Sequence, residues 1–488
     1  MNALSFGPLD YLALFPPLVM AFFGCVTLLL DVVSRYASAR SGHWLIGVST
    51  VGVLLTAYAY VLQWQTISDH ASFIALEGAV TVDSLALFTN VIVWISTAAL
   101  LCISYRYLEF AGEHRGEYYA LAFFAQCGMY FMAASVDLIA LFVGLELTAI
   151  CFYILVGFTR RERRANEAAL KYLLLGAISS AFVVYGFSLF YGVAGSTALS
   201  SIALAIRQRG PFDAFVLLGV VTTVVGLLFK VSAVPFHAWA PDAYEGAPTP
   251  VTAYLSVASK IAAFAVLIRI LWFALPFTRP VWEPVLIVAA VLSLTVGSIA
   301  ALTQLHLKRL LAYSSIAHAG YILLGLIAGT SLALRGIYVY LLVYAVMTFG
   351  AFAVLASLRR HGIIGDDLTD LRGLSQTHPT HAALFVILLL SLAGIPPTAG
   401  FIAKYFIFAA LIETSHITLA IIAAVYAAIS LYIYFRLVRE MYFFNAETRE
   451  PIAASFGIQF SLVLTTAITI LLGIFPEPIL HIIAGGSK

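Results

Sequence analysis

The residues best suited to chemistry in this chain are a few charged side chains inside long apolar runs. Four of the six lysines and one glutamate stand in such runs: Lys171, Lys230, Lys260, Lys404 and Glu146. Burial disfavours the charged form of any such group, and a buried lysine can titrate at about 5–6 instead of about 10.4, whereas arginine stays protonated. Lysine is therefore the residue expected where a proton must be taken up and released.

Glu146 and Lys230 are candidates for a titrating pair. Glu146 lies in the middle of its apolar run, and Lys230 stands shortly before a proline. A carboxylate beside an ammonium group keeps its charge more easily, and two such groups titrate as a unit. Moving the lysine or delivering a proton would switch such a pair. The alternative for a lysine is a side chain that extends to the membrane surface, which fits Lys171 best because Arg164 is only seven residues away.

Two histidines are further candidates for proton transfer. His237 follows a proline in an interrupted run, and His318 lies inside an apolar segment. Imidazole titrates near pH 6.5 and can pass a proton between lysines, but a hydrogen-bonded packing role is equally open for both. Asp137, at the start of an apolar segment, is expected to lie at the membrane interface or to cap a helix. The tyrosines of run 340–344 are expected to be ordinary packing residues.

The composition requires a membrane. Of 488 residues, 62% are hydrophobic and 10% are charged, and the mean hydropathy is +1.00. Soluble chains average roughly 45–50% apolar and about 25% charged residues, so a soluble enzyme and a disordered chain are both excluded. The runs do not alternate as barrel strands do, which predicts an all-α polytopic membrane protein. Fourteen transmembrane segments are predicted, centred on residues 10–32, 44–64, 82–104, 118–135, 137–158, 167–193, 213–240, 249–273, 281–303, 309–329, 335–358, 381–412, 416–438 and 455–475.

Prolines interrupt two of these segments. The interruptions are at residues 234–237 and 394–400, and proline both removes a backbone donor and clashes with the preceding turn. Broken helices in corresponding places of two halves are typical of inverted repeats, with the site at the breaks. Two inverted five-helix repeats are therefore predicted, although prolines placed by chance would give the same pattern. The predicted organisation is an N-terminal three-helix segment over 1–117, a first repeat over 118–273, a second repeat over 281–438 and a C-terminal helix over 439–488.

The basic residues predict the orientation. Sixteen of the 26 lie in odd-numbered connections, and five lie in even-numbered connections and the termini. Because cytoplasmic loops carry the excess of lysine and arginine, the odd connections are expected in the cytoplasm and both termini on the opposite side.

The sequence shows no site for a redox cofactor, a nucleotide or a metal. The four cysteines lie far apart without a CxxC motif, and no glycine-rich phosphate loop occurs. His306 and His318 are twelve residues apart and no carboxylate clusters with them. The formal net charge of +2 gives no reason to expect nucleic acid as a partner. If this protein takes part in redox chemistry, another chain must carry the cofactors.

Four runs carry a resemblance to a known family. They are DLIALFVGLEL at 137–147, FKVSAVPFHAWAPDAYEGAPTPV at 229–251, KRLLAYSSIAHAGY at 308–321 and AGIPPTAGF at 393–401. With these runs, nearly the whole chain resembles the antiporter-like membrane subunits of respiratory complex I, the proton-pumping NADH–quinone oxidoreductase. Lys404 separates it from the subunit of this kind that has a glutamate at this position. The short tail separates it from the one with a long C-terminal lateral helix.

The resemblance implies a proton path of six residues and a set of partners. The residues are the charge-modulated pair Glu146 and Lys230, the assisting Lys171 near the uptake side, His237 between Lys230 and Lys260, the central relay Lys260, and Lys404 on the exit side. The chain itself is expected to hold no cofactor, with FMN and iron–sulfur clusters in partner subunits where NADH and quinone act. Neighbouring antiporter-like and small membrane subunits, and the lipid bilayer, are the expected partners. A bacterial inner membrane is expected, with both termini in the periplasm.

Three functions are weighed against one another. The first is a proton-translocating subunit of NADH–quinone oxidoreductase, driven by electron transfer in other subunits. The second is a subunit of a multi-chain cation/proton antiporter, which shares most of the motifs. The third is a stand-alone transporter of an organic substrate, for which the sequence shows no cluster of polar groups. The resemblance favours the first.

Overall fold

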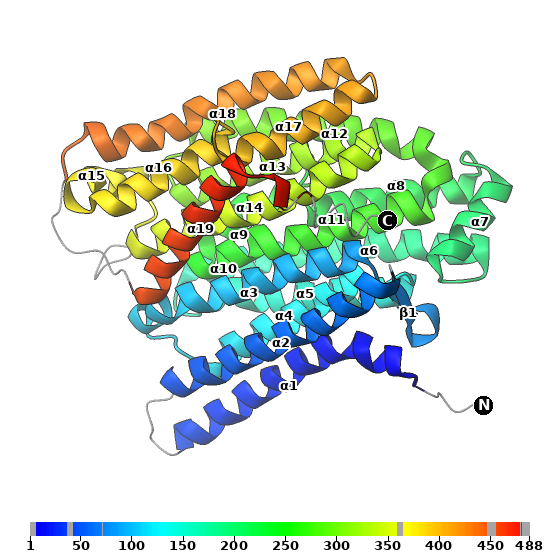
Figure 1. Cartoon of the computed structure of the whole chain (residues 1–488), viewed down its shortest axis with the longest axis horizontal. Coiled ribbons are helices and arrows are strands. Elements are labelled where there is room, and N and C mark those ends of the chain that lie inside the picture. Colours follow the sequence, from blue (N-terminus) through cyan, green and yellow to red (C-terminus); the bar gives the residue numbers. More distant parts are fainter. Residues whose placement is uncertain are drawn as a thin grey trace.

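The computed structural model describes residues 6–36, 42–70, 72–358, 365–446, 455–478 and 480, which form a helical protein with one small hairpin (Figure 1). The elements before the first break are α1 (Pro8–Tyr36), α2 (Gly42–His70), β1 (Phe73–Ala75), η1 (Leu76–Gly78), β2 (Val80–Val82), α3 (Ser84–Ala111), α4 (Gly116–Ala134), α5 (Leu138–Val156), α6 (Arg163–Ala194), α7 (Leu199–Arg209) and α8 (Ala214–Lys230). Between the breaks lie α9 (Trp239–Gly246), α10 (Thr249–Tyr254), η2 (Leu255–Ser259), α11 (Lys260–Ile268), η3 (Arg269–Ala274), η4 (Pro276–Thr278), α12 (Arg279–Thr303), α13 (Leu307–Ala328), α14 (Ser331–Leu358), η5 (Leu368–Leu371), α15 (Leu374–Thr377) and α16 (Pro379–Ala393). The last described helices are α17 (Ala399–Glu413), α18 (Ile417–Phe443) and α19 (Phe456–Ile474).

The predicted transmembrane segments correspond to these helices. Within the described residues, eleven helices are long and apolar enough to cross a membrane, and each matches one predicted segment. The other three predicted segments are α4, the pair α8 and α9, and the pair α16 and α17. The prediction of an all-helical polytopic membrane protein is confirmed, with the antiparallel β1–β2 hairpin between α2 and α3 as a small addition.

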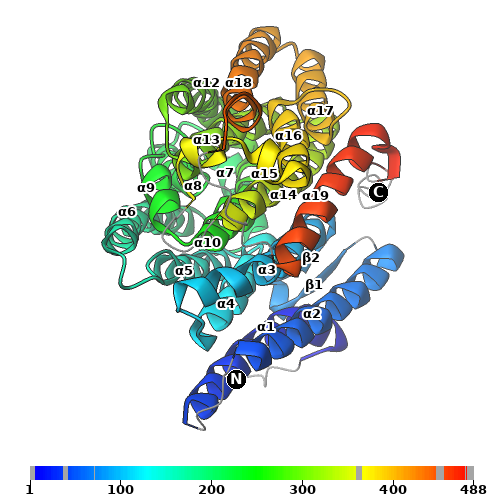
Figure 2. The ribbon, with the colours of Figure 1, turned by 90° about the vertical axis from the view of Figure 1, so that its left-hand side faces the viewer.

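The helices lie side by side, and three of them form the centre. Figures 1 and 2 show α1 and α2 at one edge and α18 at the opposite edge. The span 249–274, which runs from α10 through η3, is almost wholly buried, as are α13 and α14. The span keeps its helical course through two π-helical segments, η2 and η3. Such π-turns are frequent at functional sites, and Lys260 stands directly after the first of them.

Both predicted breaks are present, and side chains satisfy the backbone groups that the breaks expose. At the first break, Trp239 Nε1 donates to the carbonyl of Phe229 at 3.0 Å, and Ser293 Oγ accepts from the backbone N–H of Val234 at 2.9 Å. At the second, the N–H of Gly400 donates to Ser391 Oγ at 3.0 Å. Irregular backbone persists inside a membrane only with such partners.

The order of the helices agrees with the predicted repeats. Within each predicted repeat, 118–273 and 281–438, the broken helix is the fourth span. Lys230 ends the helix before the first break, and Lys404 lies in the helix after the second break. The inverted relation of the repeats and their boundaries stay predictions.

Candidate functional site

Glu146 and Lys230 lie close together, and a serine bridges them. Glu146 is on α5, and its Oε1 is 3.9 Å from the Nζ atom of Lys230. Ser180 on α6 donates a short hydrogen bond to the same carboxylate oxygen, and its Oγ accepts one from Lys230 Nζ at 3.3 Å. Both side chains are partly buried, with Lys230 11% and Glu146 29% exposed. A proton arriving at the carboxylate would therefore change both the salt bridge and the serine hydrogen bonds.

Sequence reasoning did not find Ser180. It is one of two adjacent serines in an apolar helix, and serine is common in such helices because it can bond to the preceding turn. The neighbouring Ser179 shows a different use, since its Oγ donates to the carbonyl of Gly226 across the α6–α8 contact at 2.9 Å. Only the packing of α5, α6 and α8 distinguishes the two.

Lys171 lies apart from this pair, in the N-terminal third of α6. Its ammonium group is 2.9 Å from Glu167 Oε1 and 3.1 Å from Asp242 Oδ2, and its side chain is 48% exposed. It precedes Ser180 by nine residues, which is about 13 Å along a helix. Asp242 also accepts from Arg309 on α13 at 2.8 Å. Lys171 therefore belongs to a surface ion-pair network between α6, α9 and α13, close to the alternative considered from the sequence.

His237 lies in the first break, between α8 and α9, and is half-buried. Its backbone carbonyl accepts from Ala240, which starts the turn into α9. Among the described residues, no hydrogen bond joins the imidazole ring to Lys230 or to Lys260. The structure places His237 near the first lysine in sequence but does not connect the two lysines through it.

Lys260 lies in the centre of the protein and is 2% exposed. Its ammonium group donates to the carbonyl oxygen of Ser315 on α13 at 3.1 Å and makes a short hydrogen bond to the Oγ of the same serine. Ser315 Oγ is 2.7 Å from the hydroxyl of Tyr344 and 3.4 Å from that of Tyr244. In the part of the chain that the structure describes, no carboxylate forms an ion pair with Lys260. Neutral hydroxyl and carbonyl oxygens solvate it instead.

His318 lies one turn further along α13, inside a cluster of tyrosines. Its Nδ1 is 2.7 Å from the hydroxyl of Tyr340, and its Nε2 is 3.5 Å from that of Tyr434. The His318 and Tyr344 rings are in contact, with centroids 5.5 Å apart. Tyr340 and Tyr344, expected to be ordinary packing residues, also hydrogen-bond through their hydroxyls to His318 and Ser315. The sequence had left open whether His318 transfers protons or is a hydrogen-bonded packing residue.

Lys404 on α17 is 4% exposed and points at the end of another helix. Its Nζ donates to the carbonyl oxygens of Ala393 at 2.6 Å and of Leu392 at 3.3 Å, which are the last residues of α16. It also stands 5.0 Å from the centre of the Tyr321 ring. The C-terminus of a helix carries a partial negative charge and unpaired carbonyls. Lys404 is therefore stabilised by α16 and not by an acidic side chain.

These contacts form a nearly continuous polar row from Lys260 to Lys404. From Lys260 it passes through Ser315 and Tyr344 to the ring of His318. His318 bonds to Tyr340, whose ring stacks on that of Tyr321 with centroids 6.3 Å apart. The ammonium group of Lys404 lies over the Tyr321 ring. No hydrogen bond between described residues continues the row from Lys260 to Lys230. The row brings titratable and hydroxyl groups together over one half of the protein. Ring contacts, not hydrogen bonds, join Tyr344 to His318 and Tyr340 to Lys404.

Two further charges inside the helical core have structural partners. The guanidinium of Arg269, 1% exposed, donates to both carboxylate oxygens of Asp83 at 2.7 Å and to the carbonyl of Ala133 at 3.0 Å. This pair fastens α3 to the central span. Asp137 caps α5, as expected, accepting from the N–H groups of Ile139 and Ala140 at 2.8 and 3.2 Å.

Lys308 is the second residue of α13 and is buried. Its Nζ is 3.0 Å from Asp366 Oδ2 and 3.1 Å from the carbonyl of Ala247, which follows α9. His306, just before α13, faces the same carboxylate at 3.9 Å. Burial lowers the pKa of His306 and Lys308 lowers it further, while Asp366 opposes both. This group fastens α13 to the segments after α9 and before η5.

No group of three or more histidine, cysteine, aspartate or glutamate side chains within the described ranges could hold a metal ion. The residues that come together are instead suited to moving protons.

Three comparisons place this geometry among known proteins. The sequence family described as NADH:quinone oxidoreductase/Mrp antiporter, TM, matches residues 135–469. The chain is 52% identical over 483 residues to NADH-quinone oxidoreductase subunit N 2 of Solibacter usitatus, with 98% of each covered. A chain of respiratory complex I from Thermus thermophilus superposes with a TM-score of 0.80 at 32% identity, over 96% of this chain and 100% of that one. A chain of the Mrp complex from Dietzia, at 21% identity and a TM-score of 0.81 over 96% of both chains, shares the fold.

Proposed function

The chain belongs to the NADH:quinone oxidoreductase/Mrp antiporter family, among the N subunits of NADH-quinone oxidoreductase, and we propose that it moves protons through its buried lysines. It is a membrane-arm subunit of complex I, the proton-translocating oxidoreductase. Electrons pass from NADH to quinone in other subunits. In this proposal FMN and iron–sulfur clusters belong to those subunits, and this chain supplies only titratable side chains.

The observation that carries the proposal is the row from Lys260 to Lys404. Both ammonium groups are buried, and neither has an acidic side chain as an ion-pair partner among the described residues. A buried amine without a carboxylate can lose its proton at an accessible pH, whereas an arginine at the same place would not. Tyrosine, serine and histidine between them can accept and donate in turn. Such a row is suited to proton transfer and has no evident structural purpose.

Glu146, Ser180 and Lys230 act as the switch in this proposal. While the carboxylate is charged, it holds Lys230 through the salt bridge and the serine. Protonation of Glu146 would weaken this hold and free Lys230 to move toward Lys260, to which no hydrogen bond between described residues now connects it. Lys260 then serves as the central relay and Lys404 as the exit group. Lys171 assists on the uptake side, and His237 assists between Lys230 and Lys260.

We further propose the surroundings of the chain. Its neighbours in the complex are other antiporter-like subunits and small membrane subunits, and its membrane is the inner membrane of a bacterium. Both termini lie on the periplasmic side, which follows from the basic residues in the odd connections. Several of those basic residues, such as Arg40, Arg359, Arg360 and Arg449, lie outside the described residues.

The test is Lys260→Met in the assembled complex. Methionine has a similar length and cannot carry a proton, and its introduction at 260 leaves no carboxylate unpaired among the described residues. We expect the complex to assemble, while acidification of inverted vesicles per NADH oxidised falls. Lys230→Met should behave alike, and Arg161→Gln, on the surface, is the control. Unchanged acidification in an assembled Lys260→Met complex would contradict the proposal.

The cation/proton antiporter remains the second outcome to test, because the matched family includes such subunits. Purification of the tagged chain in mild detergent separates the two. Copurifying flavin, iron–sulfur clusters and NADH oxidation support complex I. A purely membrane-bound assembly with sodium- or potassium-driven proton exchange would favour the antiporter.

A further inference from the structure

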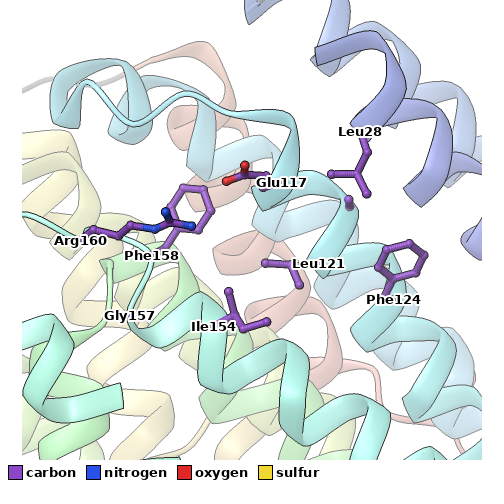
Figure 3. Close-up of a pocket in the computed structure, with 9 residues that line it drawn as sticks. Leu28, Glu117, Leu121, Phe124, Ile154, Gly157, Phe158 and Arg160 are labelled. Atoms are coloured by element: carbon purple, nitrogen blue, oxygen red, sulfur yellow. The ribbon is translucent and has the colours of Figure 1, made fainter. Parts of the chain in front are cut away.

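A cavity of about 230 Å³ lies between α1, α4 and α5, away from the row of lysines (Figure 3). Its lining residues are Leu28, Glu117, Ala120, Leu121, Phe124, Ile154, Gly157, Phe158 and Arg160. Seven of these nine residues are apolar or glycine, and the other two, Glu117 and Arg160, carry opposite charges. The cavity therefore has the character of a site for an amphiphile.

The two charges stand at one end of this cavity, and the apolar residues form the other. Figure 3 shows Glu117 and Arg160 together with Phe158 at one end, and Leu28 and Phe124 at the opposite end. Glu117 is in the first turn of α4, and Phe124 is seven residues, or about 10 Å, further along the helix. An elongated ligand with a charged head and an apolar tail fits this division.

The charged end lies at the surface of the membrane. Arg160 belongs to the connection between α5 and α6 together with Arg161, and two more arginines, Arg163 and Arg164, begin α6. Arg160 is exposed and Glu117 is half-buried, and neither forms an ion pair within the part of the chain that the structure describes. Basic pockets between transmembrane helices at this level recognise phospholipid headgroups.

We propose that this cavity binds a glycerophospholipid with an ethanolamine headgroup. Arg160 binds the phosphate, Glu117 binds the primary ammonium group, and one acyl chain fills the space along Leu121, Phe124 and Leu28. Water is a poor occupant, because an apolar cavity offers it few hydrogen bonds. A headgroup with only a negative charge would meet the carboxylate of Glu117, and a choline headgroup has no N–H to donate.

The position of this lipid gives it a structural consequence. α1 and α4 precede residues 135–469, which match the family, whereas α5 lies within them. The acyl chain would fill the joint between the N-terminal helices and the helix that carries Glu146. The lipid is thus expected to hold α1 against the core and not to take part in proton transfer.

The test measures lipid retention on the purified complex. After delipidation, the complex is titrated with phosphatidylethanolamine, phosphatidylcholine or phosphatidylglycerol, and bound lipid is counted by native mass spectrometry. We expect one tightly held phosphatidylethanolamine that Arg160→Gln and Glu117→Gln each weaken by about tenfold, the size of one charge-assisted hydrogen bond. Arg161→Gln, an exposed arginine that does not line the cavity, is the matched control.

A second pair of variants tests the acyl-chain end without altering charge. Ile154→Trp places a large side chain in the cavity from an exposed position. Ile150→Trp introduces the same side chain at an exposed position one turn earlier on α5, which does not line the cavity. We expect only Ile154→Trp to release the lipid. The proposal would be overturned if the three cavity variants retained the lipid as well as the two controls do. Equal binding of the three lipids, or a neighbouring subunit found in the cavity, would also overturn it.

Discussion

The Nζ atom of Lys404 lies 2.6 Å from the carbonyl oxygen of Ala393, at the end of the helix that precedes its own. In the other half of the protein, Lys230 meets a carboxylate, Glu146, at 3.9 Å. The two lysines at the breaks are thus stabilised differently. Lys404 has a fixed partner in the dipole of α16, whereas Lys230 has a partner, Glu146, whose charge can change with a proton. This difference suits a switch at the start of a path and a fixed site near its end.

Gly394→Ala tests the fixed site. Gly394 has φ +84°, and a Cβ there would lie 2.8 Å from Lys404 Cδ and 3.0 Å from its Nζ. We expect the methyl group to push the ammonium off the α16 carbonyls and to lower proton pumping severalfold in an assembled complex. Acidification of vesicles per NADH oxidised is the measurement.

The control for this variant is Gly195→Ala. Gly195 has φ +64°, and nothing lies within 4 Å of its Cβ position, so alanine there costs only the backbone strain of about 1–2 kcal/mol. If both variants lower pumping equally, strain and not the position of Lys404 is responsible.

Ser180→Ala tests the bridge at the switch. The change removes the hydroxyl that bonds both Glu146 and Lys230, while the salt bridge at 3.9 Å remains. Hydrogen bonds to charged groups contribute about 1.5–3 kcal/mol, so we expect pumping to fall by about tenfold or more and its pH optimum to move. Ser188→Ala, on the same helix, removes only a bond to the carbonyl of Tyr185 and should leave both unchanged. A Ser180→Ala complex with the wild-type pH profile would rule out a role for the bridge.

Asp83→Ala tests the buried ion pair that is not part of the path. Arg269 would keep its charge at 1% exposure without its carboxylate partner, and breaking such a pair destabilises a protein by about 3–5 kcal/mol. α3 would also lose its capping bond to Ala86. We expect reduced amounts of complex and a lower melting temperature. Glu109→Ala breaks the exposed pair with Arg106, which contributes about 0–1 kcal/mol, and should leave both unchanged.

The sequence predicted the parts of this protein that depend on rare residues. Lysine, glutamate and proline are conspicuous in apolar segments, so Lys260, Lys404 and Glu146 and both breaks could be predicted from residue type and position. The helices followed from apolar length alone. Such predictions are possible because a charge or an interrupted backbone costs so much in a membrane that it needs a reason.

The partners of these residues could not be predicted in the same way. Ser180 and Ser315 have no unusual neighbours in sequence, and the carbonyl of Ala393 is present in any chain. Their roles arise from helices far apart in sequence that pack together. Lys308 shows the same limit, since its place directly before the predicted segment 309–329 did not show that Asp366 and Ala247 would enclose it.

The two histidines provide the sharpest test of what the structure adds. The resemblance placed His237 between Lys230 and the central relay Lys260, but the hydrogen bonds between described residues connect His318 with Tyr340 and Tyr434, on the way from Lys260 to Lys404. We therefore expect His318→Gln to lower vesicle acidification per NADH oxidised by roughly tenfold or more, as for loss of a proton-transfer group, and His237→Gln to lower it less. Glutamine keeps a hydrogen-bonding side chain of similar size, so the amount of assembled complex should be the same in both variants. If His237→Gln has the larger effect, protons cross between Lys230 and Lys260 by a rearrangement that brings His237 to them, and the row through His318 is not the step that limits pumping.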